Sequence, residues 1–192
     1  MTRAELKEAA KSQIKGNIGI LLIMMILVAV VAAVPVVGAV LSPGLSLSMV
    51  MIYLNLTYGD EPKLEDLLGG VKMLGKAWCL SLLIGIFTFL WALLLYIPGI
   101  IKALSYSMSY YILADNPDMT AREALNESKR ITQGHKGEIF VLGLSFIGWI
   151  LLTAVTLGIA GIYTVPYMQT TMANFYQSIK APVVYVEGPE IP

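Results

Sequence analysis

The stretch IGILLIMMILVAVVAAVPVVGAVL, residues 18–41, contains only apolar residues, glycine and proline. About 20 apolar residues in a helix cross the hydrocarbon core of a bilayer. The run is also longer than the ~7–15 residues of a signal-peptide core. We therefore expect a retained first transmembrane helix at residues 18–41.

The composition extends this interpretation to the rest of the chain. Of 192 residues, 57% are hydrophobic and 14% are charged, whereas about 25% are charged in a typical soluble domain. Charged residues are absent from residues 16–59, 77–101 and 139–179. The first and the last of these stretches are each about twice the length of one crossing, so each is expected to hold two.

The same counts argue against several classes of protein. The net charge is zero, so no basic excess indicates nucleic acid as a partner. One cysteine, Cys79, is too few for an intrachain disulfide or a thiol metal site, and one histidine, His135, provides no cluster for zinc. Phosphate-loop and nucleophile-elbow motifs are also missing from the sequence. We therefore expect no cofactor, no metal and no enzymatic activity.

The order of charges predicts a topology. Uncharged turns with Gly and Pro are expected at residues 41–44, 96–99 and 157–166, and the charged segments lie between them. Basic residues near membrane segments stay cytoplasmic, so both termini are expected in the cytoplasm and the protein in the cell membrane. The six expected crossings are residues 18–41, 44–58, 77–97, 99–115, 138–160 and 164–180. Residues 44–58 reach only about 22 Å as a helix, so four full and two partial crossings remain the alternative.

A weak repeat of about sixty residues organises the prediction. Each unit reads as a polar amphipathic helix, a Gly/Lys pair, a long apolar helix, a turn and a shorter helix. The shorter helices align as SLSMVMIY (46–53), SYSMSYYI (105–112) and QTTMANFY (169–176). The predicted fold is all-α and polytopic, with three parallel helix-hairpin repeats at about residues 1–58, 60–116 and 117–180. These form one integral membrane domain, residues 1–180, followed by a flexible tail, residues 181–192.

The polar helices are expected at the inner membrane interface. Thr2 with Glu5, and Thr120 with Glu123, have the spacing of a capping box, and Gly134 is expected to end the third-unit helix. One basic stripe recurs every four residues and consists of Arg3, Lys7, Lys11 and Lys15. Each basic residue contributes about 1 kcal/mol toward anionic lipid. The alternative is a solvated helix that only fixes topology.

Polar side chains on the shorter helices define the candidate site. The candidates for a lipid or solute cavity are Lys102, Ser105, Ser109, Ser48, Asn55, Thr170 and Asn174. Lys102, Ser105 and Ser109 lie at i, i+3 and i+7 and would share one helix face. Convergence of the three faces would give a polar intramembrane cavity with Lys102 as its cation. The alternatives are interhelical hydrogen bonds and, for Lys102, a lysine that extends to the headgroups.

The stretches IPGIIKALSYSMSYYILADNP (97–117), TAREALNESKRITQGHK (120–136) and FVLGLSFIGW (140–149) carry a resemblance to a known family. The opening AELKEAAKSQIKGN (4–17) and the closing TLGIAGIYTVPYMQTTMANFYQSI (156–179) fit the same pattern. Together they resemble an uncharacterised bacterial membrane family, catalogued as domain of unknown function nine-seven-five. The resemblance implies a membrane protein and implies no activity.

Two functions remain open from the sequence. The first is a non-enzymatic envelope protein that binds membrane lipid, anionic lipid included, or a membrane-protein partner. The alternative is a small transporter or channel with a polar cavity lined by the shorter helices. Apart from the terminal residues of the expected spans, the sequence offers one charged residue within them, Lys102, and no carboxylate for proton coupling, which favours the first.

Overall fold

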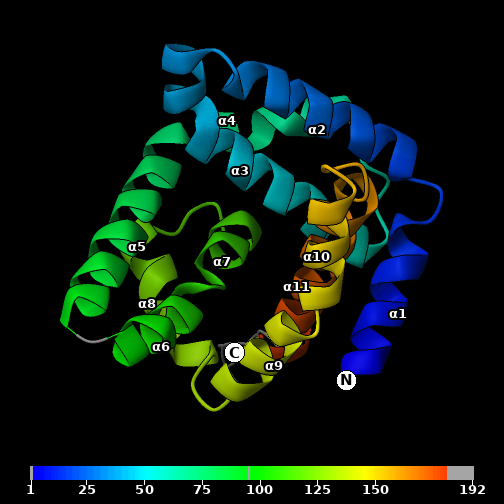
Figure 1. Ribbon diagram of the computed structural model, residues 1–192. Coiled ribbons are helices and arrows are strands. Elements are labelled where there is room, and N and C mark those ends of the chain that lie inside the picture. The colour runs from blue at the N-terminus through cyan, green and yellow to red at the C-terminus, as the bar shows by residue number, and fades with distance from the viewer. Residues whose placement is uncertain (1, 95, 181–192) are drawn as a thin grey trace, which may run out of the picture.

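The predicted all-α class is confirmed. The computed structural model describes residues 2–94 and 96–180, and within them every regular element is a helix (Figure 1). The predicted tail, residues 181–192, lies outside the described residues. The helices are α1 (Arg3–Ile14), α2 (Ile18–Ala32), α3 (Pro35–Tyr58), the 3₁₀ helix η1 (Leu64–Leu68), α4 (Gly69–Lys72), α5 (Leu74–Leu94), α6 (Tyr96–Tyr106), α7 (Ser109–Asp115), α8 (Ala121–Ile131), α9 (Lys136–Leu144), α10 (Ile147–Val155) and α11 (Gly161–Ile179).

Between two and four segments are long and apolar enough to cross a membrane among the described residues. Two are single spans, Pro35–Tyr58 and Lys136–Val155, the second formed by α9 and α10 together. Two more are bent pairs: α1 meets α2 at 86°, and Leu64–Lys72 meets Leu74–Leu90 at 69°. The six-crossing, three-repeat architecture therefore stays a prediction.

The first predicted hairpin is wrong in its details. The expected span 18–41 is divided at residues 33–34, and α3 continues through the expected turn at 41–44 with Pro43 inside it. Pro35 occupies the first turn of α3, where the missing amide hydrogen costs nothing. Pro43 cannot bond the Ala39 carbonyl, but the Ser42 hydroxyl donates to that oxygen at 3.3 Å. Such a substitute bond allows proline to remain inside a membrane helix.

The second and third hairpins also differ from the prediction. The expected helix 99–115 is two helices, α6 and α7, with a break at Ser107 and Met108. The Ser107 hydroxyl donates to the Leu104 carbonyl at 2.8 Å, and such local bonds compete with a continuing helix. The expected turn at 157–166 is shorter, because α10 ends at Val155 and α11 begins at Gly161 with Pro166 inside it.

Both predicted capping boxes are confirmed. The Thr2 and Thr120 hydroxyls accept the amide hydrogens of Glu5 and Glu123, and each glutamate accepts the threonine amide in return. These bonds from Thr120 lower the pKa of Glu123. Gly134 has a φ of +92°, the left-handed conformation expected where α8 gives way to the next element. The polar segment of the second unit is less regular, since it forms η1 and α4 instead of one helix.

The short helix α4 packs very closely against α3. Ser48 of α3 donates its hydroxyl hydrogen to the Leu67 carbonyl at 2.7 Å and accepts the Gly70 amide hydrogen at 2.9 Å. A Cβ atom at Gly70 would lie 2.3 Å from the Gly44 carbonyl oxygen. Only glycine fits this contact, and it fixes the start of α5 relative to α3.

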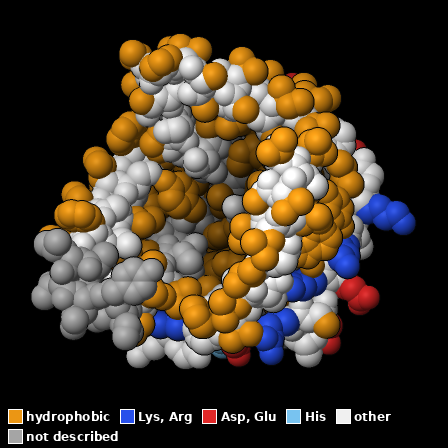
Figure 2. All heavy atoms as spheres, in the orientation of Figure 1, with side chains coloured by type: hydrophobic (Ala, Val, Ile, Leu, Met, Phe, Trp, Pro, Cys, Tyr) orange, Lys and Arg blue, Asp and Glu red, His pale blue; other side chains and the backbone are white. Residues whose placement is uncertain are grey.

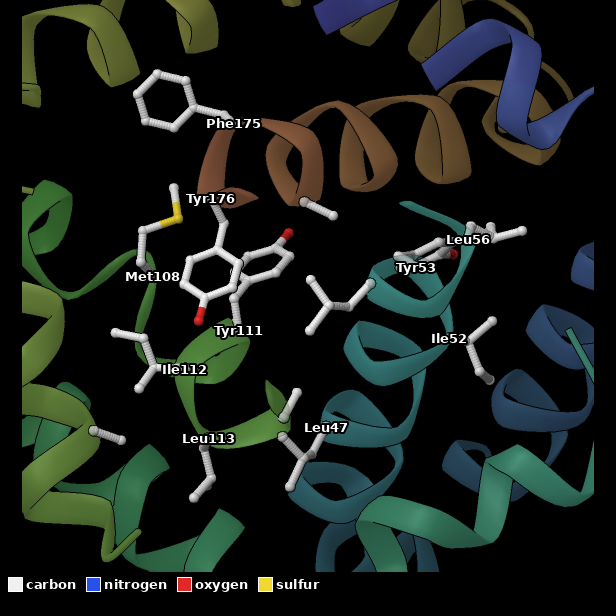
Figure 3. Close-up of a cluster of buried hydrophobic side chains, with 14 of the residues drawn as sticks. Leu47, Ile52, Tyr53, Leu56, Met108, Tyr111, Ile112, Leu113, Phe175 and Tyr176 are labelled. Atoms are coloured by element: carbon white, nitrogen blue, oxygen red, sulfur yellow. The ribbon is translucent and has the colours of Figure 1, made fainter. Parts of the chain in front are cut away.

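The interior and the surface are divided as in a membrane protein. The buried hydrophobic cluster extends from α1 to α11, and Figure 3 shows a part of it, with Tyr111 and Tyr176 side by side. Many large apolar side chains are exposed along α2, α5, α9 and α10, among them Val30, Phe89 and Leu151 at 61%, 67% and 60%. In Figure 2 the visible face is largely hydrophobic, and basic side chains gather at the edge formed by α1. An exposed apolar surface of this extent is expected to contact lipid.

Candidate functional site

A cavity of about 670 Å³ lies between α2, α3, α7 and α11. Its size is typical of small-molecule sites. Each of the four helices contributes, and the α6–α7 break adds Ser107. The lining residues are Met25, Val28, Ala29, Ser46, Met49, Val50, Tyr53, Ser107, Tyr110, Tyr111, Val165, Gln169 and Met172. Three methionines supply flexible, polarizable walls that adapt to irregular apolar ligands.

The cavity changes character from its mouth to its floor. At the mouth Ala29, Ser46 and Val165 are exposed, and the hollow visible in Figure 2 has a largely hydrophobic rim. At the floor Tyr53 and Tyr111 are buried, at 2% and 5% exposure. A ligand would therefore meet apolar surface first and phenol groups last.

Hydrogen bonds fix most polar groups of the floor. The Tyr111 hydroxyl donates to the Gln169 Oε1 atom at 2.9 Å, and the Tyr111 ring stacks on Tyr176 with centroids 6.0 Å apart. The Tyr110 hydroxyl pairs with the Ser81 hydroxyl of α5. The Tyr53 hydroxyl is different, because it is buried and has no hydrogen-bond partner among the described residues.

The predicted cavity residues do not line this cavity. Five are buried in contacts between or within helices: Ser48, Ser105, Ser109, Thr170 and Asn174. Ser48 holds α4 as described above, and Asn174 forms a reciprocal amide pair with Gln13 of α1, at 2.6 and 3.2 Å. The Ser105 carbonyl accepts the Ser128 hydroxyl hydrogen at 2.8 Å. The Ser48 and Asn174 side chains therefore have the helix-joining contacts that were the alternative interpretation, whereas the Ser105 hydroxyl donates to the Ile101 carbonyl of its own helix at 2.8 Å.

The remaining two candidates lie elsewhere. Lys102 is half-buried on α6, and the α6–α7 break ends the continuous face that it was expected to share with Ser109. Asn55 lies near the end of α3 and lines a polar cleft together with the loop residues Asp60, Glu61 and Lys63 and with Asp66 of η1. Lys102 and Asn55 therefore do not line the cavity, and Lys102 does not line the cleft at Asn55.

The basic stripe on α1 is only partly a free surface. Leu6, Ala10 and Ile14 are buried where α1 packs against α11. Lys7 donates to the Ser145 carbonyl at 3.4 Å and lies 5.0 Å from the centre of the Phe146 ring. Its burial, together with Lys11 and Arg3, lowers the pKa of Lys7. Arg3, Lys11 and Lys15 are exposed and remain able to meet anionic headgroups.

A second cluster, which the sequence interpretation missed, joins the ends of α3, α7 and α11. Asp115 accepts hydrogen bonds from Tyr58 at 2.7 Å and from Tyr176 at 2.9 Å. Lys180 donates to Asp115 at 3.1 Å and to the Tyr58 oxygen at 2.5 Å. We call these four residues the inner clamp. Because Tyr176 stacks on Tyr111, the inner clamp is connected to the cavity floor.

Signals for both features are present in the sequence. The aligned blocks 46–53, 105–112 and 169–176 contain most of the cavity-lining residues. These residues lie on a different face of each helix from the predicted site residues. The inner clamp places an aspartate and a lysine at the ends of two aligned short helices, in positions that a charge-pair search could have found.

Comparison with known proteins gives one match. No curated protein and no solved structure matches the chain. The match is to a family model and covers α6 to α11. This part of the chain includes α7 and α11 of the cavity lining and three residues of the inner clamp, Asp115, Tyr176 and Lys180. The opening segment, residues 4–17, lies outside it. Residues 92–182 match the family described as "Protein of unknown function (DUF975)", and this confirms the resemblance over that part of the chain.

Proposed function

We propose that the protein is a non-enzymatic integral protein of the cell membrane that holds a lipid-type amphiphile in the cavity between α2, α3, α7 and α11. The observation that carries the proposal is the gradient within the cavity, from an exposed apolar mouth to a buried phenol floor. An amphiphile fits this gradient with its chains at the mouth and its polar end on the floor. The exposed residues of the basic stripe, Arg3, Lys11 and Lys15, would hold anionic headgroups at the inner interface.

Blocking the mouth of the cavity tests this function. The double variant Ala29→Trp/Ser46→Trp places two indole rings at the exposed mouth, and we expect it to lose most of the lipid that co-purifies with the wild-type protein. The measurement is native mass spectrometry of gently extracted protein. The matched control is Leu151→Trp, which adds the same ring to an exposed position of α10 that does not line the cavity. Equal lipid retention by Ala29→Trp/Ser46→Trp and Leu151→Trp would contradict the proposal.

The proposed orientation gives a prediction of its own. Cysteines introduced at Val36, in the first turn of α3, and at Leu157, between α10 and α11, should react with an impermeant thiol reagent added outside intact cells, because these positions are 76% and 94% exposed. Cysteines at the exposed positions Glu65 and Asn126 should not react. The background is Cys79→Ala, because Cys79 is the native thiol and is exposed. Labelling of Asn126→Cys from outside would contradict cytoplasmic termini and the six-crossing topology.

Solute passage is the second candidate function. It is favoured by the polar groups that face the cavity, namely Ser46, Ser107 and Gln169. A flux assay with the purified protein in liposomes distinguishes the two. Flux that the Ala29→Trp/Ser46→Trp variant abolishes and Leu151→Trp preserves would establish transport instead of lipid holding.

A further inference from the structure

A second hollow, a cleft of about 410 Å³, lies between α1 and α9, where the first residues of the two helices come close together (Figure 1). Leu6 of α1 and Phe175 of α11 are buried and form its floor. Arg3 of α1 and Glu138 of α9 also line the cleft and are exposed at its rim. None of its lining residues lines the cavity between α2, α3, α7 and α11, so the two hollows are separate.

Arg3 and Glu138 bring opposite charges to this cleft without neutralising each other. In the described part of the chain the two residues form no ion pair with each other. The Glu138 carboxylate contacts the Nδ1 atom of His135 through Oε2 at 3.1 Å, and its other oxygen, Oε1, remains as an acceptor. A ligand with an anionic and a cationic group can pair with both residues, whereas a ligand with an anionic group alone would be attracted by Arg3 and repelled by Glu138.

The position of the cleft along α9 indicates that such a ligand is a lipid. The candidate span Lys136–Val155 begins two residues before Glu138, which places Glu138 at the depth of lipid headgroups. Val141 also lines the cleft, is 38% exposed, and lies about 4.5 Å further along the helix axis. The exposed side chains of Phe140 and Leu144 continue this apolar surface of α9. The cleft therefore combines charge at headgroup depth with apolar surface toward the membrane interior, which is the order of groups in a phospholipid.

We propose that the cleft between α1 and α9 binds the headgroup of a zwitterionic phospholipid with a primary ammonium, of the phosphatidylethanolamine class. The Arg3 guanidinium donates hydrogen bonds to the phosphate, the ammonium donates to the Glu138 carboxylate, and the acyl chains follow the exposed apolar surface of α9. Both contacts are charge-assisted hydrogen bonds, which are stronger than neutral ones. Phosphatidylcholine binds more weakly, because its quaternary ammonium has no hydrogen to donate. This site is additional to the cavity and does not depend on the proposed function.

The experiment compares two lipids that differ only in the methylation of the ammonium. Full-length protein in detergent, with the cavity blocked by Ala29→Trp/Ser46→Trp, is mixed with equimolar dioleoyl phosphatidylethanolamine and dioleoyl phosphatidylcholine. Native mass spectrometry counts the bound lipids, and we expect phosphatidylethanolamine to predominate. Glu138→Gln should lower the ratio of phosphatidylethanolamine to phosphatidylcholine about 2- to 5-fold, the upper range of an exposed ion pair. Arg3→Gln should weaken the binding of both lipids, because both carry the phosphate.

The matched controls make the same charge changes outside the cleft. Glu8→Gln on α1 and Arg122→Gln on α8 replace exposed residues that do not line it, and both should leave the lipid ratio and the amount of bound lipid unchanged. The comparison is repeated without the cavity block, so it does not depend on the folding of Ala29→Trp/Ser46→Trp. Thermal unfolding of each variant confirms that binding is measured on folded protein.

Three results would overturn the inference. The first is a lipid ratio that Glu138→Gln leaves at its original value. The second is displacement of the bound lipid by equimolar free phosphoethanolamine, which would identify a soluble ligand. The third is coupling between Arg3→Gln and Glu138→Gln in the Tm of lipid-free protein, which would show that the two side chains pair directly. None of these results bears on lipid holding in the cavity, which the comparison of Ala29→Trp/Ser46→Trp with Leu151→Trp tests.

Discussion

Replacement of Gly70 by alanine is expected to destabilise the protein, whereas the same replacement at the adjacent Gly69 is expected to be harmless. In a helix, alanine is normally favoured over glycine by about 1 kcal/mol. At Gly70 the added Cβ would lie 2.3 Å from the Gly44 oxygen, 2.5 Å from the Ser48 nitrogen and 2.9 Å from the Leu47 Cβ. Two of these are backbone atoms of α3, so relief requires that the helices separate.

The separation would also break the bonds that Ser48 makes across the contact. Overpacking costs about 1–3 kcal/mol, and each lost hydrogen bond adds about 0.5–1.5 kcal/mol. At Gly69 the nearest atoms belong to the flexible Met51 side chain at 3.5 Å, an ordinary contact distance. Thermal unfolding in detergent should therefore show a clearly lower Tm for Gly70→Ala and an unchanged or higher Tm for Gly69→Ala. Matching Tm values for the two variants would mean that α4 does not pack on α3 in this way.

Replacement of Asp115 by asparagine is the second change with a large expected effect. The shape of the side chain is kept, but the inner clamp loses the charge that Lys180 pairs with and an acceptor for one tyrosine hydroxyl. Hydrogen bonds to a charged group contribute about 1.5–3 kcal/mol. Because the Asp115 and Lys180 side chains are 20% and 30% exposed, solvent screening places the expected loss of unfolding free energy near the lower end, about 1–2 kcal/mol.

The control for this variant is Asp118→Asn, three residues further along the chain and exposed, which should leave Tm unchanged. A double-mutant cycle with Lys180→Met isolates the pair, since the two losses should be less than additive if the residues act together. High salt should reduce the difference between Asp115→Asn and wild type. Full additivity with Lys180→Met would show that the ion pair contributes nothing.

The sequence predicted features that depend on neighbouring residues or on overall hydropathy. The all-α class followed from the long charge-free stretches, because unpaired backbone groups are excluded from lipid and helices satisfy their own. Thr120 and Glu123 were recognised as a capping box because the motif lies within one turn of a helix. Both kinds of signal are local, and tertiary contacts do not alter them.

The sequence did not predict features that depend on contacts between distant segments. Pro43 indicated a turn. The helix continues instead because the Ser42 hydroxyl donates to the Ala39 carbonyl, and this bond depends on a side-chain orientation that the sequence does not show. Ser105 and Ser109 were assigned to one face because the helix was assumed to continue through Ser107. The cavity floor pairs Tyr111 with Gln169, which are 58 residues apart, and such a pair has no local pattern.

The inner clamp also constrains the order in which the protein assembles. Tyr58 and Lys180 are separated by 122 residues, so at a synthesis rate of about 5–20 residues per second the ribosome needs roughly ten seconds to pass from one to the other. During that interval Tyr58 and Asp115 can pair with each other, but Lys180, which bonds both of them, has not yet been made. The ends of α3 and α7 are therefore joined to a third helix only after α11 has been made, and closure of the helical assembly is a late event in its biogenesis.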